Sequence, residues 1–566
     1  MKHWWQDKVI YQIYPKSFKD TNGDGIGDLQ GIISKLDYLK YLGIGAIWLS
    51  PIFSSPQADN GYDVSDFYNI DPMFGTMDDF DKLIIEANKR NIKILVDLVL
   101  NHTSDEHPWF LEAKKSKDNP YHDFYVWRDG DGITPPTQLR ASFGGSAWEY
   151  VPEIGQYYLH QYAIQQPDLN WDNPNVRAEI HKIVNFWINK GVGGFRFDVI
   201  DMVAKEPDIN VTANGKNLHK YLQEMVSVCK FKELDLLTVG ETFSATTETA
   251  KIFSNPDGSE FSMIFNFEHF LLDRQEGMEK WDLRPLNLLE LKKVIDNWQT
   301  ELFEKGWNSL YLENHDSARI VSRWGNDQHF RIESSKMLAT FYQLLSGTPY
   351  VYQGQELGMT NPEWYDINLF NDLDTINMYN ERLAKGYPES EIFKSIHAKS
   401  RDNARTPFQW SSEKYAGFST HKPWLDLNDN YTEINLANQI GDKNSILNYY
   451  KALISLRSKY SVLVYGNYKD LLPQDADIVA YERKYNDEHL VVICNFTSQT
   501  IKRDLQNLYA DYELIINSYG DNILEDKVIP EESNSDQKKT ILRPYESRVY
   551  YKQINQGKIE IMELSN

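Results

Sequence analysis

The sequence predicts an α/β protein whose main domain is a TIM (β/α)8 barrel, with an excursion domain after strand 3 and a C-terminal antiparallel β-sandwich. Short apolar runs alternate with longer helical patterns, as in a parallel sheet built from βα units. One long loop-rich stretch interrupts this alternation, and turn-rich short strands replace it near the C-terminus. The chain of 566 residues, 41% of them hydrophobic, is long enough to bury a large core.

The barrel prediction depends on eight apolar or β-branched runs. Helical segments separate them, such as Gly31 to Leu42 and Asn175 to Gly191, the second of which ends at a glycine. Eight strand-helix units are typical of a TIM barrel. The eight runs are Val9 to Pro15, Ala46 to Pro51, Lys93 to Leu100, Gly194 to Ile200, Leu236 to Thr242, Met263 to Glu268, Asn308 to Asp316 and Thr348 to Glu356.

Two other stretches predict the remaining domains. Residues 103–171 are loop-rich and too long for an ordinary βα loop, which indicates an excursion domain that overhangs the active face. After about Leu463, short strands such as Ile478 to Tyr485 alternate with turn-rich spacers, up to a last strand near Arg548 to Tyr551. We expect the barrel to comprise 1–102 and 172–462, and the C-terminal β-sandwich 463–566.

Composition argues against several classes of function. The 59 Lys and Arg against 82 Asp and Glu give a net charge of −23, which disfavours nucleic-acid partners and anionic membrane surfaces. The two cysteines, Cys229 and Cys494, lie far apart and argue against a disulfide scaffold or a zinc cluster. The chain shows neither a signal-peptide pattern nor a run of about 20 apolar residues. We therefore expect a cytoplasmic, monomeric protein.

Charged residues gather where the expected strands end, and in a TIM barrel these ends carry the catalytic groups. Asp198, Glu241 and Asp316 lie at the ends of the fourth, fifth and seventh runs. Arg196 lies two residues before Asp198, so both side chains share one strand face, where the arginine would keep Asp198 ionised. Glu241 would then retain a proton. One carboxylate and one protonated carboxyl suit glycoside hydrolysis through a covalent glycosyl intermediate.

Longer motifs carry a family resemblance over nearly the whole chain. They include SPQADNGYDVSDF, DLVLNHTSDEHPWF, QPDLNWDNP, GFRFDVIDM, ENHD and RDNARTPFQW. Together they resemble the α-amylase superfamily (glycoside hydrolase family 13), and within it the oligo-1,6-glucosidase and dextran glucosidase (glucan 1,6-α-glucosidase) type. The resemblance implies a retaining exo-α-glucosidase that acts on small oligosaccharides. Asp198 would be the nucleophile, Glu241 the general acid/base, and Asp316 the third carboxylate that grips the sugar hydroxyls.

The resemblance also implies how the sugar is held. Arg405 is expected to pair with Asp59 and close the blind end of the pocket. Val199, next to the nucleophile, is typical of α-1,6 specificity because its branched side chain narrows the space for an α-1,4-linked unit. Phe243 stands where dextran glucosidases often carry tryptophan, so we expect weaker stacking on longer isomalto-oligosaccharides. The implied substrate-binding residues are Asp59, Tyr62, His102, Phe143, Tyr162, Gln166, Arg196, Val199, His315 and Arg405.

A loop near the N-terminus resembles the first part of an EF-hand. It presents oxygen-bearing side chains at alternate positions, with glycines that allow a tight turn. It lacks the bidentate glutamate of a calcium sensor, and an ordinary Asn/Asp/Gly turn would look similar. The family resemblance implies a structural Ca²⁺ held by Asp20, Asn22, Asp24, the carbonyl of Ile26, and Asp28.

Three other functions stay open. A trehalose-6-phosphate hydrolase would share nearly every catalytic motif but needs a cationic pocket for phosphate, to which Lys280 could contribute. Hydrolysis of sucrose or isomaltulose, or transfer to another sugar, is compatible because any hydroxyl that fits intercepts a covalent intermediate. A non-catalytic, transporter-associated or carbohydrate-binding relative is a remote alternative, against which the three retained carboxylates argue.

Overall fold

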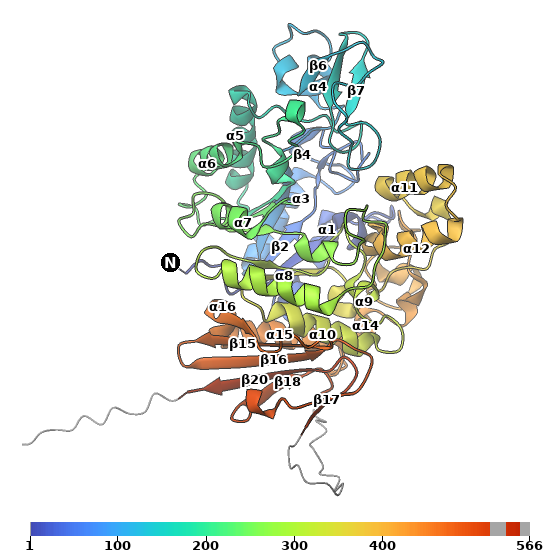
Figure 1. The fold of residues 1–566 in the computed structure, drawn as a ribbon. Coiled ribbons are helices and arrows are strands. Elements are labelled where there is room, and N and C mark those ends of the chain that lie inside the picture. Colours follow the sequence, from blue (N-terminus) through green and yellow to red (C-terminus); the bar gives the residue numbers. More distant parts are fainter. Residues whose placement is uncertain (1, 521–538, 555–566) are drawn as a thin grey trace, which may run out of the picture.

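The structure is a computed structural model that describes residues 2–520 and 539–554. A small domain and a β-rich C-terminal domain lie on opposite sides of a central barrel (Figure 1). Within the described residues, no helix is both long and apolar enough to cross a membrane.

Eight parallel strands form the barrel, and the predicted fold class is confirmed. Their order is β11-β10-β9-β5-β2-β1-β13-β12, and a parallel bridge between Ile264 and Asn308 joins the two ends. The Ser309 hydroxyl donates to the Ile264 carbonyl at 2.6 Å across this closure. The strands are β1 (Ile10–Ile13), β2 (Ala46–Leu49), β5 (Lys93–Val99), β9 (Gly194–Asp198), β10 (Leu237–Glu241), β11 (Met263–Phe265), β12 (Ser309–Leu310) and β13 (Thr348–Tyr352).

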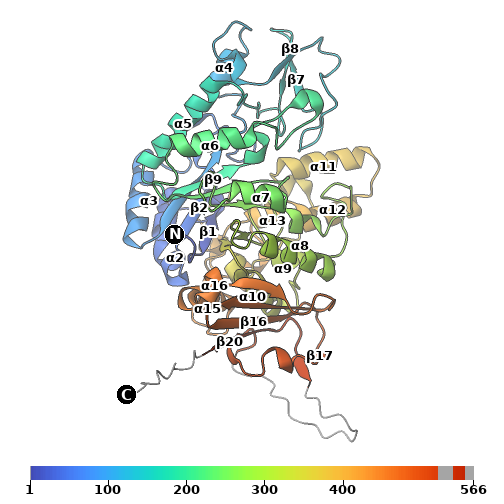
Figure 2. The same cartoon turned by 60° about the vertical axis from the view of Figure 1, so that its left-hand side comes forward.

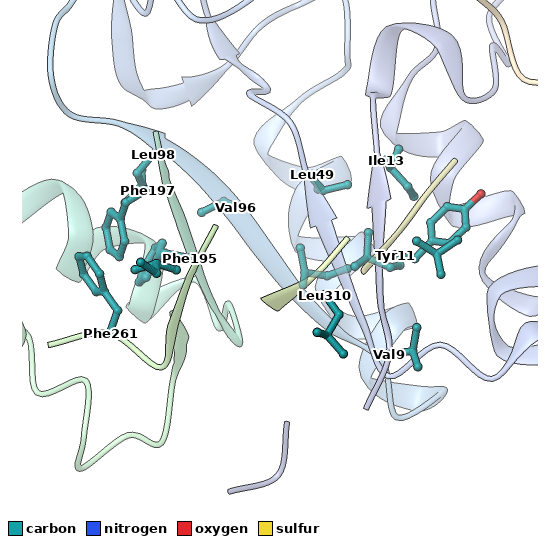
Figure 3. Packing of buried hydrophobic residues seen from close by; sticks show 14 of the residues in the cluster. Val9, Tyr11, Ile13, Leu49, Val96, Leu98, Phe195, Phe197, Phe261 and Leu310 are labelled. Atoms are coloured by element: carbon teal, nitrogen blue, oxygen red, sulfur yellow. The ribbon is translucent and has the colours of Figure 1, made fainter. Parts of the chain in front are cut away.

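Successive side chains on these strands point alternately into the barrel and outward. Leu95, Leu237 and Val239 point inward and pack with Trp48 and Phe265 in a core that fills the barrel. The outward side chains pack against the helices in a separate and larger core. Figure 3 shows part of it, with Phe195, Phe197 and Phe261 gathered on one side of the barrel wall. The alternation decides which polar residues face the barrel axis.

The helices cover the barrel wall. The segment expected as one helix from Gly31 to Leu42 forms two, because Lys35 between them leaves the helical conformation at ψ 3°. Asn173 caps α5, and Gly191 follows this helix at a φ of 86°, where glycine is favoured. The helices are α1 (Leu29–Ser34), α2 (Leu36–Leu42), α3 (Met77–Lys89), α5 (Pro174–Asn189), α6 (Leu218–Val228), α7 (Thr247–Phe253), α8 (Leu288–Glu301), α9 (Ile320–Arg323), α10 (Arg331–Gln343), α11 (Leu373–Ala384), α12 (Glu389–Lys399), α13 (Asp402–Arg405), α14 (Leu436–Gln439), α15 (Ile446–Lys459) and α16 (Val462–Tyr465).

Residues 103–171 form a small unit between β5 and α5. It contains α4 (Pro108–Ala113) and an antiparallel sheet of β6 (Trp127–Asp129), β8 (Gln156–Leu159) and β7 (Trp148–Val151). Its own apolar cluster includes Trp148, Tyr157 and Leu159. Figure 2 shows this unit at the end of the barrel away from the C-terminal domain. A separate pairing of β3 (Phe53–Ser54) with β4 (Asp66–Ile70) follows β2.

The C-terminal domain is antiparallel. A five-stranded sheet has the order β14-β15-β16-β20-β18, and β17 pairs with β19 beside it. The buried Arg483 joins this domain to the barrel by donating to the carbonyls of Leu344 and Gly466 at 2.5 and 2.8 Å. The strands are β14 (Asn467–Asp470), β15 (Ile478–Tyr485), β16 (Glu488–Asn495), β17 (Ile501–Arg503), β18 (Glu513–Asn517), β19 (Thr540–Leu542) and β20 (Ser547–Gln553).

Candidate active site

Three neighbouring barrel strands bring four charged side chains together. Asp97 on β5 stands beside Arg196 on β9 in the parallel register, and Val239 on β10 stands on the other side of Arg196. Inward positions recur every second residue, so Asp198 and Glu241, at the strand ends, face the same axis as Arg196. All four side chains are nearly or fully buried. The local sequence therefore builds a compact cluster at the C-terminal mouth of the barrel.

Arg196 binds all three carboxylates of this cluster. Its Nη1 lies 2.8 Å from Asp97 and 2.7 Å from Asp198, and its Nη2 lies 2.6 Å from Glu241. The expectation that Arg196 would favour ionisation of Asp198 alone is wrong, because the two ends of one guanidinium reach both acids. Val199 also donates its amide to Glu241 Oε2 at 3.1 Å.

One guanidinium cannot neutralise three buried carboxylates. Burial raises the pKa of Asp97 to about 6, and it raises the pKa of Asp198 and of Glu241, while the Arg196 charge opposes each shift. Asp198 and Glu241 also share a hydrogen bond. The pair therefore keeps a proton that is available to an oxygen bound in the pocket.

Asp316, at the end of the seventh strand segment, has the opposite surroundings. Its Oδ1 lies 2.6 Å from Arg405 and 3.5 Å from Arg401, and its Oδ2 lies 3.2 Å from His315 Nε2. Burial alone would raise the pKa of Asp316, but the neighbouring positive charges outweigh it and hold the pKa below its usual range. Burial lowers the pKa of His315 to about 3, so the two arginines supply that charge. Asp316 stays ionised.

The blind end of the pocket differs from the expectation. Asp59 pairs with Arg401, whose Nη2 lies 3.0 Å from Asp59 Oδ1, whereas Arg405 pairs with Asp316. The predicted Asp59–Arg405 pair is therefore wrong. Both arginines belong to the RDNAR motif, and the orientation of the short helix α13 decides which one faces which carboxylate. Gln166 donates to the other oxygen of Asp59 at 3.2 Å.

Two histidines and a tyrosine line the space between these clusters. The Tyr62 hydroxyl lies 2.6 Å from His315 Nε2 and donates to Asp97 at 3.0 Å, and its ring stacks on His315. His102 Nε2 lies 3.0 Å from the Tyr62 carbonyl. Burial lowers the pKa of His102 to about 4, so this imidazole is neutral near neutral pH.

The excursion domain supplies aromatic walls. Phe143 and Tyr162 pack edge to face with 5.4 Å between ring centroids, and the Arg401 guanidinium lies over the Phe143 ring at 4.7 Å. Tyr162 also lies 5.6 Å from the ring of His102. Both aromatics thus lie beside groups of the pocket, as the family resemblance implies.

Val199 has a strained backbone. Its φ of 36° and ψ of 44° are left-handed, a conformation that a β-branched residue rarely adopts. The turn directs the Val199 amide toward Glu241 and buries its side chain beside Asp198. Phe243, by contrast, is half exposed and stacks on Phe267 with 4.0 Å between centroids, so a second aromatic already covers one of its faces.

The N-terminal loop carries the donor types of a hard cation, but its side chains bind the loop itself. Asp20 accepts from the amides of Gly23 and Gly25, and Asp28 accepts from Gly31 and caps α1. Among residues 2–520 and 539–554, no three His, Cys, Asp or Glu side chains converge as a metal site. The donor chemistry fits calcium, and the ion itself stays a prediction.

Sequence reasoning missed several polar residues of the site. Arg401 binds Asp59 and also Asp372, at 2.8 Å, and Asp97 binds Nη1 of Arg196, the same nitrogen that binds Asp198. Arg401 and Asp97 both stand in motifs that the sequence analysis quoted, RDNAR and DLVLNH, which is the signal that could have found them. Asp372, the N-cap of α11, carries no comparable motif.

Comparisons with known proteins agree with this geometry. Residues 12–466 match the alpha amylase catalytic domain, and residues 468–553 match the alpha amylase C-terminal all-beta domain. The oligo-1,6-glucosidase of Parageobacillus thermoglucosidasius is 47% identical over 97% of this chain and 98% of its own. The glucan 1,6-alpha-glucosidase of Streptococcus pneumoniae serotype 4 is 49% identical over 93% of this chain and 97% of its own.

A solved structure is similar throughout its length. The trehalose-6-phosphate hydrolase (TreA) of Bacillus licheniformis superposes with a TM-score of 0.89 at 45% identity, and the match covers 98% of this chain and 100% of that one. The matched domains, the relatives and the three strand-end carboxylates lead to one conclusion: this chain belongs to the alpha-amylase family of glycoside hydrolases.

Proposed function

We propose that this glycoside hydrolase releases glucose from the non-reducing end of α-1,6-linked glucosides such as isomaltose and isomalto-oligosaccharides. The observation that carries the proposal is the connection between two groups of charged residues. The Asp198–Glu241 pair shares Arg196, and Tyr62, His102 and Gln166 connect this group to the Asp59–Arg401 ion pair. The similarity to an oligo-1,6-glucosidase and a glucan 1,6-alpha-glucosidase supports the linkage.

The reaction proceeds by double displacement. Asp198 attacks the anomeric carbon while Glu241 gives its proton to the glycosidic oxygen. The glycosidic bond breaks, the leaving sugar departs as an alcohol, and the glucosyl unit is bound covalently to Asp198. Glu241 then removes a proton from water, which attacks the same carbon and releases Asp198 and glucose. Both acids contact one guanidinium, which holds their carboxyl groups close together, as a retaining mechanism with a separation of about 5–5.5 Å requires.

The other pocket residues hold the glucosyl ring. Asp316, ionised between two arginines, stabilises the positive charge that develops on the ring in the transition state. We propose that His102, His315 and Arg196 contact ring hydroxyls and that the Asp59–Arg401 ion pair blocks the site beyond the terminal glucose, which makes the enzyme exo-acting. The buried Val199 beside the nucleophile selects the α-1,6 linkage.

Trehalose-6-phosphate hydrolysis is the second candidate, because the similarity to TreA extends over its whole chain. A phosphate needs unpaired cations near the leaving sugar. The cavity of about 540 Å³ beside Phe143 contains cations, but Lys280 pairs with Asp374, Arg382 with Asp282, and Lys385 with Glu381. The Lys280 ammonium also lies over the Trp281 ring at 4.4 Å. These pairings favour an uncharged leaving sugar.

The decisive experiment compares initial rates of glucose release from isomaltose, isomaltotriose, maltose, sucrose, isomaltulose and trehalose-6-phosphate, with Asp198→Asn as the blank. We expect isomaltose to lead and maltose to lag. If trehalose-6-phosphate is hydrolysed fastest, the proposed α-1,6-linked substrate is wrong, while the proposed double-displacement mechanism still holds. The Phe243→Trp variant is expected to raise the rate on isomaltotriose relative to isomaltose, and an unchanged ratio removes Phe243 from the leaving-group site.

We further propose that the loop of Asp20, Asn22, Asp24, Ile26 and Asp28 binds one structural Ca²⁺, which its oxygen donors support. We also propose that the protein works in the cytoplasm as a monomer. Its two cysteines are buried free thiols, as is usual in a reducing compartment. Cell fractionation and size-exclusion chromatography with light scattering test these two assignments.

A further inference from the structure

Lys205 is a buried lysine that the proposed chemistry does not use. It is 8% exposed, and its ammonium lies 2.6 Å from Asp168 Oδ2 and 2.6 Å from Asn101 Oδ1. Lys205 lies in the connection between β9 and α6, Asn101 follows β5, and Asp168 lies between β8 and α5 in the excursion domain. One ammonium therefore joins three segments that surround the sugar pocket.

The hydrogen bonds around Lys205 can be donated in only one direction. An ammonium only donates, so the Asn101 side chain must turn its oxygen Oδ1 toward Lys205. Asn101 Nδ2 then faces His102 Nδ1 at 3.2 Å and donates to it. A ring nitrogen that accepts carries no proton, so neutral His102 holds its proton on Nε2. That nitrogen lies 3.0 Å from the Tyr62 carbonyl, which accepts its hydrogen bond. Gln166 Nε2 also lies 3.2 Å from it, but the Gln166 amide donates to Asp59 and to the Tyr62 carbonyl, so the Nε2–H form agrees with the contacts on both sides of the ring.

We propose that Lys205 is a positioning residue that acts through the Asn101 amide to fix His102 in the Nε2–H form, which donates to the Tyr62 carbonyl and so holds Tyr62 in place at the site. The inference rests on the proposed function and deepens it. The tautomer matters because the imidazole is neutral near neutral pH and has only one proton to place. The charged groups that face His102 are Asp168 and Lys205, and the Tyr62 carbonyl, the Tyr162 ring and the Gln166 amide complete its surroundings.

The Asn101→Asp variant tests the direction in which the hydrogen bonds between Lys205, Asn101 and His102 are donated. It keeps the size of the side chain and the partner of Lys205, but it replaces the donor that faces His102 with an acceptor oxygen. His102 must then donate from Nδ1 and lose the proton on Nε2. We expect kcat/KM to fall at least about tenfold at neutral pH, mainly through KM, which is the effect of one lost buried hydrogen bond. Activity should recover toward acidic pH, where a doubly protonated ring beside the new carboxylate again donates from Nε2.

The rates are taken on the glucoside that the wild-type protein hydrolyses fastest, so the result does not depend on the linkage. A second readout needs no activity. Ring ¹⁵N spectra of histidine-labelled protein, with His102 assigned by His102→Gln, should show Nδ1 unprotonated in the wild type and protonated in Asn101→Asp. A wild-type inactive on every glucoside would overturn the proposed function and leave this spectroscopic test intact.

Two further variants separate positioning from simple support of the domain. Lys205→Met keeps the stem of the side chain and removes the donor, and we expect KM to rise about fivefold or more. Arg128→Met is the matched control. Arg128 and Asp208 also join the excursion domain to the loop after β9, by an ion pair of 2.6 Å that has no part in the Lys205–Asn101–His102 hydrogen bonds. It should keep the wild-type KM and pH profile. If Lys205→Met fails to fold, Asn101→Asp, which keeps the Lys205–Asp168 pair, decides the question. A wild-type pH profile and His102 tautomer in Asn101→Asp would overturn the proposal.

Discussion

The carboxylates of the site differ in their surroundings, and the protein shifts the pKa values of the Arg196 group and of Asp316 in opposite directions. Around Arg196, three carboxylates share one guanidinium, and the pKa values of all three are raised. Asp316 lies between two arginines, and its pKa is lowered. Burial acts in the same direction on all of them, so the number of positive charges close to each carboxylate decides the outcome. Asp59, which shares Arg401 with Asp372 and Asp316, has a pKa raised to about 6.

This difference matches the chemistry of each end of the reacting bond. The glycosidic oxygen needs a proton as it leaves, and the crowded group around Arg196 retains one. The sugar ring gains positive charge in the transition state, and the permanent anion of Asp316 stabilises that charge. One pocket therefore supplies an acid and an anion at the same pH.

The largest expected effect belongs to Asp198→Asn. Loss of the nucleophile should lower kcat by a factor on the order of 10⁴ or more. The melting temperature should rise, because one of the three carboxylates that compete for Arg196 is removed. Calorimetry and initial rates on the same preparation check both effects. A lower melting temperature would contradict the idea that this group is crowded.

Asp316→Asn should have the opposite effect on stability. We expect kcat to fall about 10²–10³-fold, because the anion that stabilises the transition state is lost. The free energy of unfolding should fall by about 1–2 kcal/mol, a value reduced for the partial exposure of this side chain to the pocket, since Arg401 and Arg405 lose a partner. If both variants shift the melting temperature in the same direction, the comparison fails.

The pH dependence of these two stability differences gives a sharper test. A raised folded-state pKa means that Asp198 contributes stability below its unfolded pKa and loses that contribution as pH rises through its folded pKa. The gain from Asp198→Asn should therefore be largest at neutral pH and shrink on acidification. Asp316, with a lowered pKa, contributes above about pH 4 and loses that contribution as pH falls through its folded pKa. Urea unfolding between pH 4 and pH 8 should show the Asp198→Asn difference shrink on acidification, while the Asp316→Asn difference stays constant over this range and shrinks only at lower pH.

Val199→Asn should have a smaller effect. Asparagine tolerates the left-handed backbone that strains valine, which relieves about 1 kcal/mol, but burial of its amide costs a similar amount, so the free energy of unfolding should change little. The loss of the branched side chain should lower the ratio of isomaltose to maltose hydrolysis several-fold. Val199→Ile serves as the matched control, since it keeps both the strain and the branching. An unchanged ratio of isomaltose to maltose hydrolysis in Val199→Asn would show that Val199 does not determine the linkage preference.

The smallest effect on activity is expected from calcium. If the loop of Asp20 to Asp28 takes a Ca²⁺ ion, calcium at 100 times its dissociation constant adds about 2.7 kcal/mol to the free energy of unfolding, and a chelator removes it. Activity below the melting transition should change little, since the loop lies outside the pocket. The matched variant Asp24→Asn should weaken the response to calcium. A melting temperature indifferent to chelator, with no metal by elemental analysis, would remove calcium from this protein.

Much of the active site follows from strand periodicity. Asp198 and Glu241 end apolar runs at inward positions, and parallel strands bring such positions to one mouth, so the sequence places both acids beside Arg196. The partner of Asp59 does not follow in this way. Arg401 and Arg405 have the same charge and stand four residues apart, and only the packing of α13 against the barrel directs one to Asp59 and the other to Asp316.

The sequence by itself determined the barrel, its strand-end carboxylates and the family, because apolar periodicity and contiguous motifs are local properties of the chain. The tertiary structure alone decided how charges are shared. Arg196 serves three carboxylates rather than one, and Lys205 meets Asn101 across 104 positions of the chain. Protonation states and tautomers depend on which groups lie within about 3 Å of each other in space. No local pattern contains that distance, so only the folded chain fixes it.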